Sequence, residues 1–194
     1  MTTITPESLM TLEAYSKARA EFRRKVLAHK RNRTVHAGDH ITLLFEDELT
    51  VRYQIQEMLR IERIFEEDGI RHEIDAYGPL VPDGRNLKAT MLIEYPEVEE
   101  RRRALAELKG VERRVWLQVE GCDKVWPIAD EDLERENDEK TSAVHFLRWD
   151  LDDEMAAAMK YGVAVSVGVD HPACRLGGTP LEPAVVAALA ADLR

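Results

Sequence analysis

Residues 40–69 read HITLLFEDELTVRYQIQEMLRIERIFEEDG, and two different periodicities meet in this stretch. Its first part, residues 40–46, alternates and is rich in β-forming side chains, which predicts a strand. The remainder repeats apolar side chains every three or four positions, which predicts a helix with Thr50 as its N-cap and Gly69 as its stop. A strand that leads directly into an amphipathic helix indicates a fold that contains both kinds of element.

The rest of the chain supplies another long helix and several more strands. Thr5, Pro6 and Glu7 form a helix-start signal, so a helix is predicted from there to about Lys30. Residues 115–128 read as a hairpin. Further strands are predicted at 87–95, 142–150 and 163–169, and further helices at 97–109, after Asp152, and after a capping box at 179–182.

These elements predict an α+β fold. Strands separated by helices of unequal length, without a regular βαβ rhythm, indicate a largely antiparallel sheet of about five or six strands. The long N-terminal helix and the helix after Thr50 are expected to pack on that sheet, where the N-terminal helices can form a lobe. With 194 residues the chain can form a full core, so a single domain, 1–194, is expected, with a helical part at 5–69 and a sheet-rich part at 87–194.

Composition excludes several classes of function. The net charge of −10 opposes a general nucleic-acid binder, because contact with phosphates favours a basic surface. The first ten residues lack the pattern of a signal peptide, and no apolar run is long enough to span a membrane, so a cytoplasmic protein without a membrane partner is expected. Cys122 and Cys174 lie far apart in sequence, which predicts free thiols and excludes a disulfide framework or a cysteine zinc site.

One acidic residue lies within the apolar stripe of the helix after Thr50. With 100° per residue, Glu62 falls inside the arc that holds Val51, Ile55 and Met58. A buried carboxylate is costly unless it is paired, protonated or bound to a metal. Arg19 lies on the apolar stripe of the first helix, so Arg19 and Glu62 are predicted to form a buried ion pair. An exposed Glu62 and a catalytic or metal-binding Glu62 are the alternatives.

A metal site is predicted from residues late in the chain. His145 lies on one predicted strand, while Asp170 and His171 end another. If those strands adjoin, two imidazoles and a carboxylate converge, a ligand set that suits iron, zinc or manganese. The competing interpretation is that His145 packs in a sheet and Asp170 caps a turn. His36 and His40 have helix-like spacing, but Gly38 between them makes a shared helix face a poor prediction.

The charge distribution suggests a protein partner. A basic segment near the end of the first helix contrasts with an acidic run at residues 130–139. The helix uses its apolar stripe for the core, so the basic side chains are expected to face outward and to bind an acidic surface, on a second subunit of a homodimer or on a redox protein. The basic segment comprises Arg23, Arg24, Lys25, Lys30, Arg31 and Arg33.

Five stretches resemble an uncharacterised bacterial domain-of-unknown-function family, DUF3501. They are GDHITLLFEDELTVRYQIQEMLRIERI, YGPLVPDGRNLKATMLIE, ADEDLER, KTSAVHFLR and GVDHP. Members are often encoded near rubrerythrin-like proteins and near iron–sulfur proteins related to heterodisulfide reductase. The resemblance therefore implies a cytoplasmic accessory role in redox or oxidative-stress metabolism, with such a protein as the partner. It implies no catalytic residues.

Two functional hypotheses follow. The sequence has no GxSxG, HExxH, Walker-type or GxGxxG motif, so the catalytic residues are unknown and the absence of a cofactor is the leading expectation. The first hypothesis is a non-enzymatic accessory protein that serves a redox partner. The alternative is a metal-binding protein or metal-dependent enzyme that uses His145, Asp170 and His171.

Overall fold

The computed structural model describes residues 4–132, 135, 137 and 139–194. Its larger sheet is antiparallel and has the strand order β1-β2-β3-β6-β5. A tight turn with Gly38 at φ 68° joins the first two strands. The bounds are β1 Thr34–Ala37, β2 Ile41–Phe45, β3 Asn86–Ile93, β5 Ile128–Ala129 and β6 Val144–Asp150.

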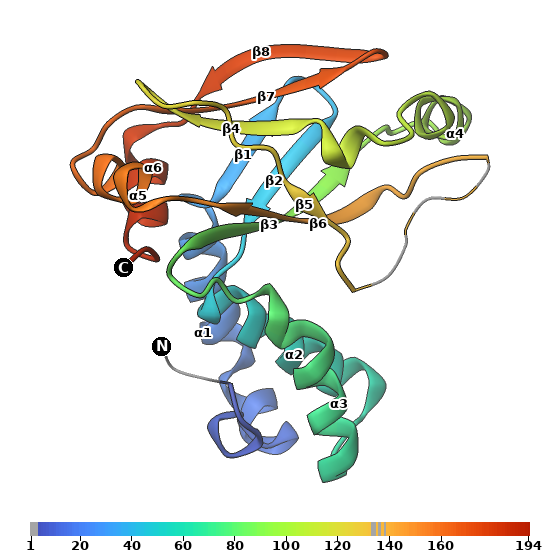
Figure 1. The fold of residues 1–194 in the computed structure, drawn as a ribbon. Coiled ribbons are helices and arrows are strands. Elements are labelled where there is room, and N and C mark those ends of the chain that lie inside the picture. Colours follow the sequence, from blue (N-terminus) through green and yellow to red (C-terminus); the bar gives the residue numbers. More distant parts are fainter. Residues whose placement is uncertain (1–3, 133–134, 136, 138) are drawn as a thin grey trace.

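A second antiparallel sheet has the order β4-β7-β8, with β4 Val115–Val119, β7 Val165–His171 and β8 Cys174–Pro180. Figure 1 shows this sheet packed over the larger one. Alternating side chains of both sheets point into one shared core, which also takes up the apolar sides of α4 Val98–Glu107, α5 Asp153–Lys160 and α6 Pro183–Ala190. The predicted α+β, largely antiparallel architecture is confirmed, but the strands form two sheets.

The N-terminal helices form a helical unit of their own. α1 Leu12–Lys30 packs on α2 Glu48–Glu62, and α2 packs on α3 Glu67–Tyr77. Val51, Ile55 and Leu59 of α2 enclose a separate small core with Ile4 and with partly buried residues of α3. Figure 1 shows the unit below the sheets. The N-terminal helices therefore form a lobe beside the sheets, and they pack mainly on one another.

Several helix ends differ from the prediction for local reasons. Pro6–Ser8 forms only a 3-10 turn, η1, and α1 begins at Leu12, where the Thr11 side chain accepts from the backbone N of Ala14. α2 begins after Asp47, which forms a capping box with Thr50. It ends at Glu62 because Arg63 is left-handed, at φ 55°.

The sequence did not predict α3, β1 or β8. Gly69, predicted to end α2, lies inside α3. Thr179, predicted to cap the last helix, lies in β8, and the N-cap of α6 is Glu182. The predicted 115–128 hairpin is reduced to one bridge between Leu117 and Val125. Two more 3-10 turns complete the chain, η2 Gly78–Leu80 and η3 Val111–Arg113. No helix among the described residues is long and apolar enough to cross a membrane.

Candidate functional site

The β1–β2 hairpin and the residue that follows β3 present four polar side chains on the outer face of the larger sheet. His36 is exposed between buried Val35 and Ala37, and it lies opposite Thr42 in the register of the two strands. His40 ends the turn, and its backbone O accepts from the backbone N of Glu94 at 2.8 Å. Because strand side chains alternate between faces, His36, His40, Thr42 and Glu94 share one face. We call these four residues the hairpin cluster.

Hydrogen bonds join the hairpin cluster into one network. The Thr42 hydroxyl donates to Glu94 Oε2 at 2.6 Å, and Thr42 Oγ1 lies 3.0 Å from His36 Nδ1. His40 Nδ1 lies 2.9 Å from the backbone O of Glu94. The His40 ring also stacks on Tyr95, with 3.8 Å between ring centroids and 15° between planes. Both imidazoles are thus held through their Nδ1 atoms.

A cavity of about 820 Å³ opens above the hairpin cluster. Its lining also includes Asp39, Tyr95 and Arg101, and Arg101 Nη1 donates to the backbone O of Tyr95 at 3.2 Å. Titratable groups of both signs therefore face one hollow whose lining also includes apolar side chains, a combination found in binding sites. Thr42, Glu94 and Arg101 were not predicted as site residues, because their proximity to His36 and His40 depends on strand pairing.

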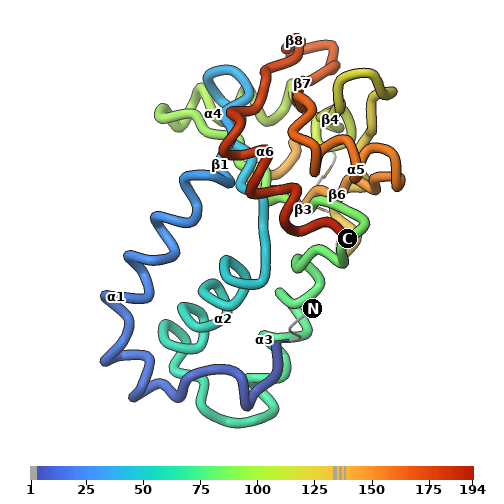
Figure 2. The backbone as a smooth tube through the Cα atoms, turned by 90° about the vertical axis from the view of Figure 1, so that its left-hand side faces the viewer, coloured from blue at the N-terminus to red at the C-terminus, as the bar shows by residue number. Residues whose placement is uncertain are grey.

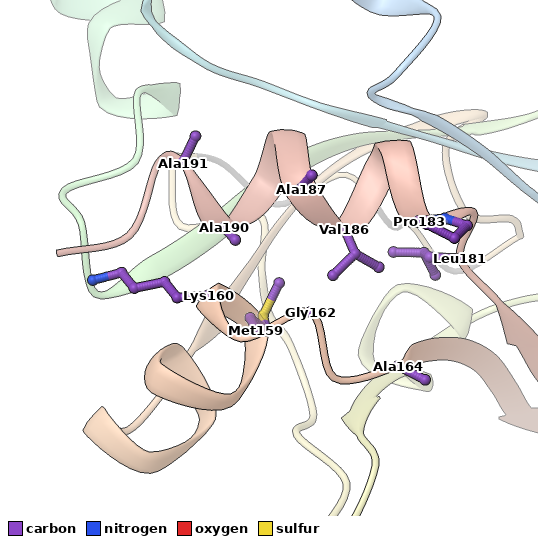
Figure 3. Close-up of a pocket in the computed structure, with 10 residues that line it drawn as sticks. All are labelled: Met159, Lys160, Gly162, Ala164, Leu181, Pro183, Val186, Ala187, Ala190 and Ala191. Atoms are coloured by element: carbon purple, nitrogen blue, oxygen red, sulfur yellow. The ribbon is translucent and has the colours of Figure 1, made fainter.

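A second cavity lies between α5 and α6 and has a volume of about 430 Å³. Figure 3 shows Met159, Val186 and Leu181 lining it, with Lys160 near its edge. Lys160 is the one charged residue among the ten that line it. The cavity has few polar groups to orient a ligand, so it is a weaker candidate than the cavity of the hairpin cluster.

The outward side of α1 forms a basic surface. Arg23, Arg24 and Arg31 are exposed around Leu27, which is 46% exposed. With 100° per residue, the three arginines lie within about 60° of Leu27 on the helix. None of the three forms an ion pair within the described part of the chain. We call these four residues the α1 basic face, and Figure 2 shows α1 along one edge of the molecule.

Arg33 does not belong to the basic surface, contrary to the prediction. Its side chain is only 4% exposed and donates to both carboxylate oxygens of Asp192, at 2.7 and 2.9 Å. It also contacts Asp47 Oδ2 at 3.1 Å and donates to His29 Nε2 at 2.9 Å. A buried arginine needs such partners, because desolvation of an unpaired charge is costly. Lys30, another member of the basic segment, lies over the Tyr53 ring.

The predicted buried pair of Arg19 with Glu62 is not found. Arg19 forms a two-point ion pair with Glu57, through Nε at 2.7 Å and Nη2 at 2.8 Å, and Tyr15 donates to the same carboxylate at 2.6 Å. Glu62 is exposed at the last position of α2. The cause is that α1 packs on the flank of α2 that carries Tyr53 and Glu57, while the apolar arc of α2 packs on α3.

The predicted late metal ligands are not brought together on adjoining strands. His145 is buried on β6 of the larger sheet, whereas Asp170 and His171 lie on β7 of the smaller sheet. His145 bonds Asp130 Oδ2 through Nδ1 at 2.6 Å, and His171 Nε2 bonds the backbone O of Lys109 at 2.8 Å. Among the described residues, no group of three or more His, Cys, Asp or Glu side chains is arranged to hold a metal ion.

The acidic run at 130–139 is partly tied to the sheet. Asp130 binds His145, and Glu131 pairs with Arg148 through two contacts at 2.8 and 2.9 Å. Residues 133, 134, 136 and 138 of this run lie outside the described residues. Both cysteines are free thiols, and burial raises the pKa of Cys122 and of Cys174, which disfavours the reactive thiolate.

Comparison with known proteins gives a family but no activity. The model of the family described as "Protein of unknown function (DUF3501)" matches residues 3–193. A crystal structure of a novel protein of unknown function from Burkholderia pseudomallei is 56% identical, covers 100% of both chains and has a TM-score of 0.96. No curated protein matches significantly.

Proposed function

The chain belongs to the DUF3501 family of proteins of unknown function, and we propose that it is a cytoplasmic accessory protein that binds an acidic partner protein through the α1 basic face. The observation that carries this proposal is the exposure of Leu27 among Arg23, Arg24 and Arg31. An apolar centre with a charged rim is the common anatomy of a protein–protein interface.

Charge supports the choice of an acidic partner. Residues 20–31 carry the five cations Arg23, Arg24, Lys25, Lys30 and Arg31 against the single acid Glu21, in a chain whose net charge is −10. Neighbouring like charges on a helix repel one another, and the carboxylates of a partner would relieve that repulsion. A local basic surface on an acidic protein also orients the approach of a partner.

The resemblance noted in the sequence suggests the nature of the partner. A rubrerythrin-like protein or an iron–sulfur redox protein is the candidate, and a second copy of this chain is the alternative. The acidic exposed residues Glu67, Asp68 and Asp75 of α3 give a second copy a surface of suitable charge.

The test uses a triple variant, Arg23→Gln, Arg24→Gln and Arg31→Gln, with Arg85→Gln, Arg102→Gln and Arg175→Gln as its control. All six side chains are exposed, so both variants lose the same charge at different places. Glutamine avoids placing a negative charge at the helix C-terminus, where it would be unfavourable. Each protein is used to capture partners from an extract of the native host, and its mass is measured by light scattering at low and high salt.

The expected result is one acidic partner, or a dimer, that is retained by the wild type and by the control variant. The α1 variant should lose it, and high salt should weaken it, because exposed ion pairs are screened. Equal retention by all three proteins would contradict the proposal. A monomer that captures no protein under any condition would also contradict it.

A further inference from the structure

α6 differs from the other described α-helices because it contains no polar or charged side chain. Its sequence is PAVVAALA, whereas each of the other described α-helices carries at least three charged residues. Val185 and Leu189 pack in the shared core, but Ala184, Ala187 and the C-cap residue Ala191 are exposed. A helix that is apolar on all sides is normally buried on all sides, which indicates that a partner covers the outward side of α6.

An apolar groove runs beside this side of α6. It is the cavity of about 430 Å³ between α5 and α6, and the buried residues Met159, Leu181 and Val186 belong to its lining. Tyr161, which lies between two lining residues at the end of α5, is 90% exposed. An unfilled apolar groove next to an unburied aromatic side chain is typical of a protein–protein interface, where aromatic anchors fill pockets of the partner.

The two ends of the groove carry opposite charges. Figure 3 shows Lys160 near Ala190 and Ala191, with Pro183 at the other end of the helix. Glu182 directly precedes Pro183 and is the N-cap of α6, so the acid and the cation lie at opposite ends. Both charged side chains are exposed, and neither forms an ion pair within the described part of the chain.

We propose that the outward side of α6 and its groove bind a second copy of this chain, with the two α6 helices antiparallel about a two-fold axis near Ala187. Each Glu182 then meets Lys160 of the other copy, and each Tyr161 lies over the Leu181 end of the other copy's groove. A parallel arrangement would instead bring like charges together, which opposes association. The alanine side chains let the two helix axes approach closely.

This self-complementarity favours a second copy over a foreign protein, because a two-fold interface uses the same surface on both subunits. Ala184 and Ala191 lie within about 60° of Ala187 on the helix, so one continuous apolar stripe faces its own copy. Burial of that stripe and of two tyrosine rings removes apolar surface from water, which stabilises the dimer.

The α6 interface is separate from the α1 basic face, and the two proposals can fail independently. Its contacts are mainly apolar, so the dimer should persist at high salt, where contacts of exposed charges are screened. The triple variant of the α1 basic face should keep this dimer. Mass at high salt therefore reports on α6, and capture of a foreign acidic protein reports on the α1 basic face.

The first test is light scattering over a concentration series at high salt, for the wild type, Ala187→Arg and Ala106→Arg. Ala187 and Ala106 are both exposed alanines on helices, but Ala106 lies on α4, away from the groove. The wild type and Ala106→Arg should be dimers. Ala187→Arg should be a monomer with an unchanged circular dichroism spectrum, because two arginines would meet at the centre of the interface. A monomeric wild type, or a dimeric Ala187→Arg, would overturn the proposal.

The second test uses charge reversal at low salt to check the antiparallel arrangement. Glu182→Lys alone and Lys160→Glu alone each bring like charges together in their own dimer, so each should weaken self-association by about tenfold or more. An equal mixture of the two variants should recover wild-type affinity, because the mixed dimer restores an opposite-charge pair at both ends. A mixture that associates no better than the separate variants would rule out this interface.

Discussion

Glu57 of α2 joins α1 through hydrogen bonds from two side chains of that helix. It accepts hydrogen bonds from Arg19, from the Tyr15 hydroxyl and from Arg60 Nη2. The bond from Arg19 is the main reason that the pKa of Glu57 falls to about 2; burial opposes this effect, and the bonds from Tyr15 and Arg60 add to it. A group that accepts this many bonds in its charged form is stabilised as a carboxylate.

Glu57→Gln should therefore lower the free energy of unfolding near neutral pH by about 1–2 kcal/mol, a modest value because Arg19 is partly exposed. The folded pKa lies below the ordinary value of 4.5, so the carboxylate stabilises the fold above about pH 4.5 and loses that effect as the pH falls toward about 2. The difference between wild type and variant should shrink across this window. Urea unfolding at several pH values measures it.

Glu62→Gln is the matched control, since it makes the same change on the same helix at an exposed position. It should change the free energy of unfolding by no more than about 0.5 kcal/mol at any pH. Equal effects of the two variants would show that Glu57 has no special role.

Arg19 and its partner show how far the sequence alone predicts a single side-chain contact. Helical periodicity indicates that Arg19 needs an acidic partner, and it has one. The identity of that partner depends on the flank of α2 that α1 contacts, which no local pattern encodes. Similarly, the spacing of His36 and His40 is visible in the sequence, but the register that places Glu94 and Thr42 beside them is set by pairing between strands far apart in the chain.

At the scale of elements, the smaller sheet depends on a glycine beneath a tryptophan. Gly168 of β7 lies opposite Trp116 of β4. A Cβ atom on Gly168 would lie 2.2 Å from Trp116 Cζ2 and 2.8 Å from the backbone O of Leu176. The ring therefore occupies the space above the glycine, as in other sheets where an aromatic side chain covers a glycine of a neighbouring strand.

Gly168→Ala should destabilise the protein by about 1–3 kcal/mol, the usual cost of overpacking. The tryptophan fluorescence should change as well, because Trp116 must move. Gly177→Ala on β8 is the control, since its Cβ would have no neighbour within 4 Å. Thermal unfolding followed by fluorescence compares the two variants, and an unchanged Gly168→Ala protein would refute the packing argument.

Helices and strands whose own sequence alternates or repeats apolar residues regularly were predicted. Strands that form because a neighbouring strand pairs with them were not. β3 alternates buried and half-buried residues along its length, so its pattern alone predicts a strand. β8, with the sequence CRLGGTP, contains two glycines and a proline, residues that are depleted in strands. It is a strand because β7 pairs with it. α3 was missed because Gly69 reads as a helix stop, although it lies in the first turn of that helix.

At the scale of the whole molecule, Arg33 connects the helical unit to the sheets. It follows α1, binds Asp47 at the start of α2, and binds Asp192 just after α6. Its Nη2 also donates to the backbone O of Ala188 in α6 at 3.3 Å. One buried side chain thus joins segments from both ends of the chain. The expected single domain requires a connection of this kind, because the helical unit has its own small core.

Arg33→Ala should cost about 3–5 kcal/mol, because it leaves Asp47 and Asp192 close together and without their cation. Loss of that connection should also separate the unfolding of the two units. The wild type is expected to unfold in one transition by both circular dichroism and tryptophan fluorescence, since all three tryptophans lie outside the helical unit. In the variant, the helical signal measured by circular dichroism should change before the tryptophan fluorescence.

Arg31→Ala, at an exposed arginine two positions earlier, is the control and should keep one transition with nearly wild-type stability. Coincident transitions in Arg33→Ala, with a loss no greater than that of Arg31→Ala, would mean that backbone continuity and apolar contacts alone couple the two units.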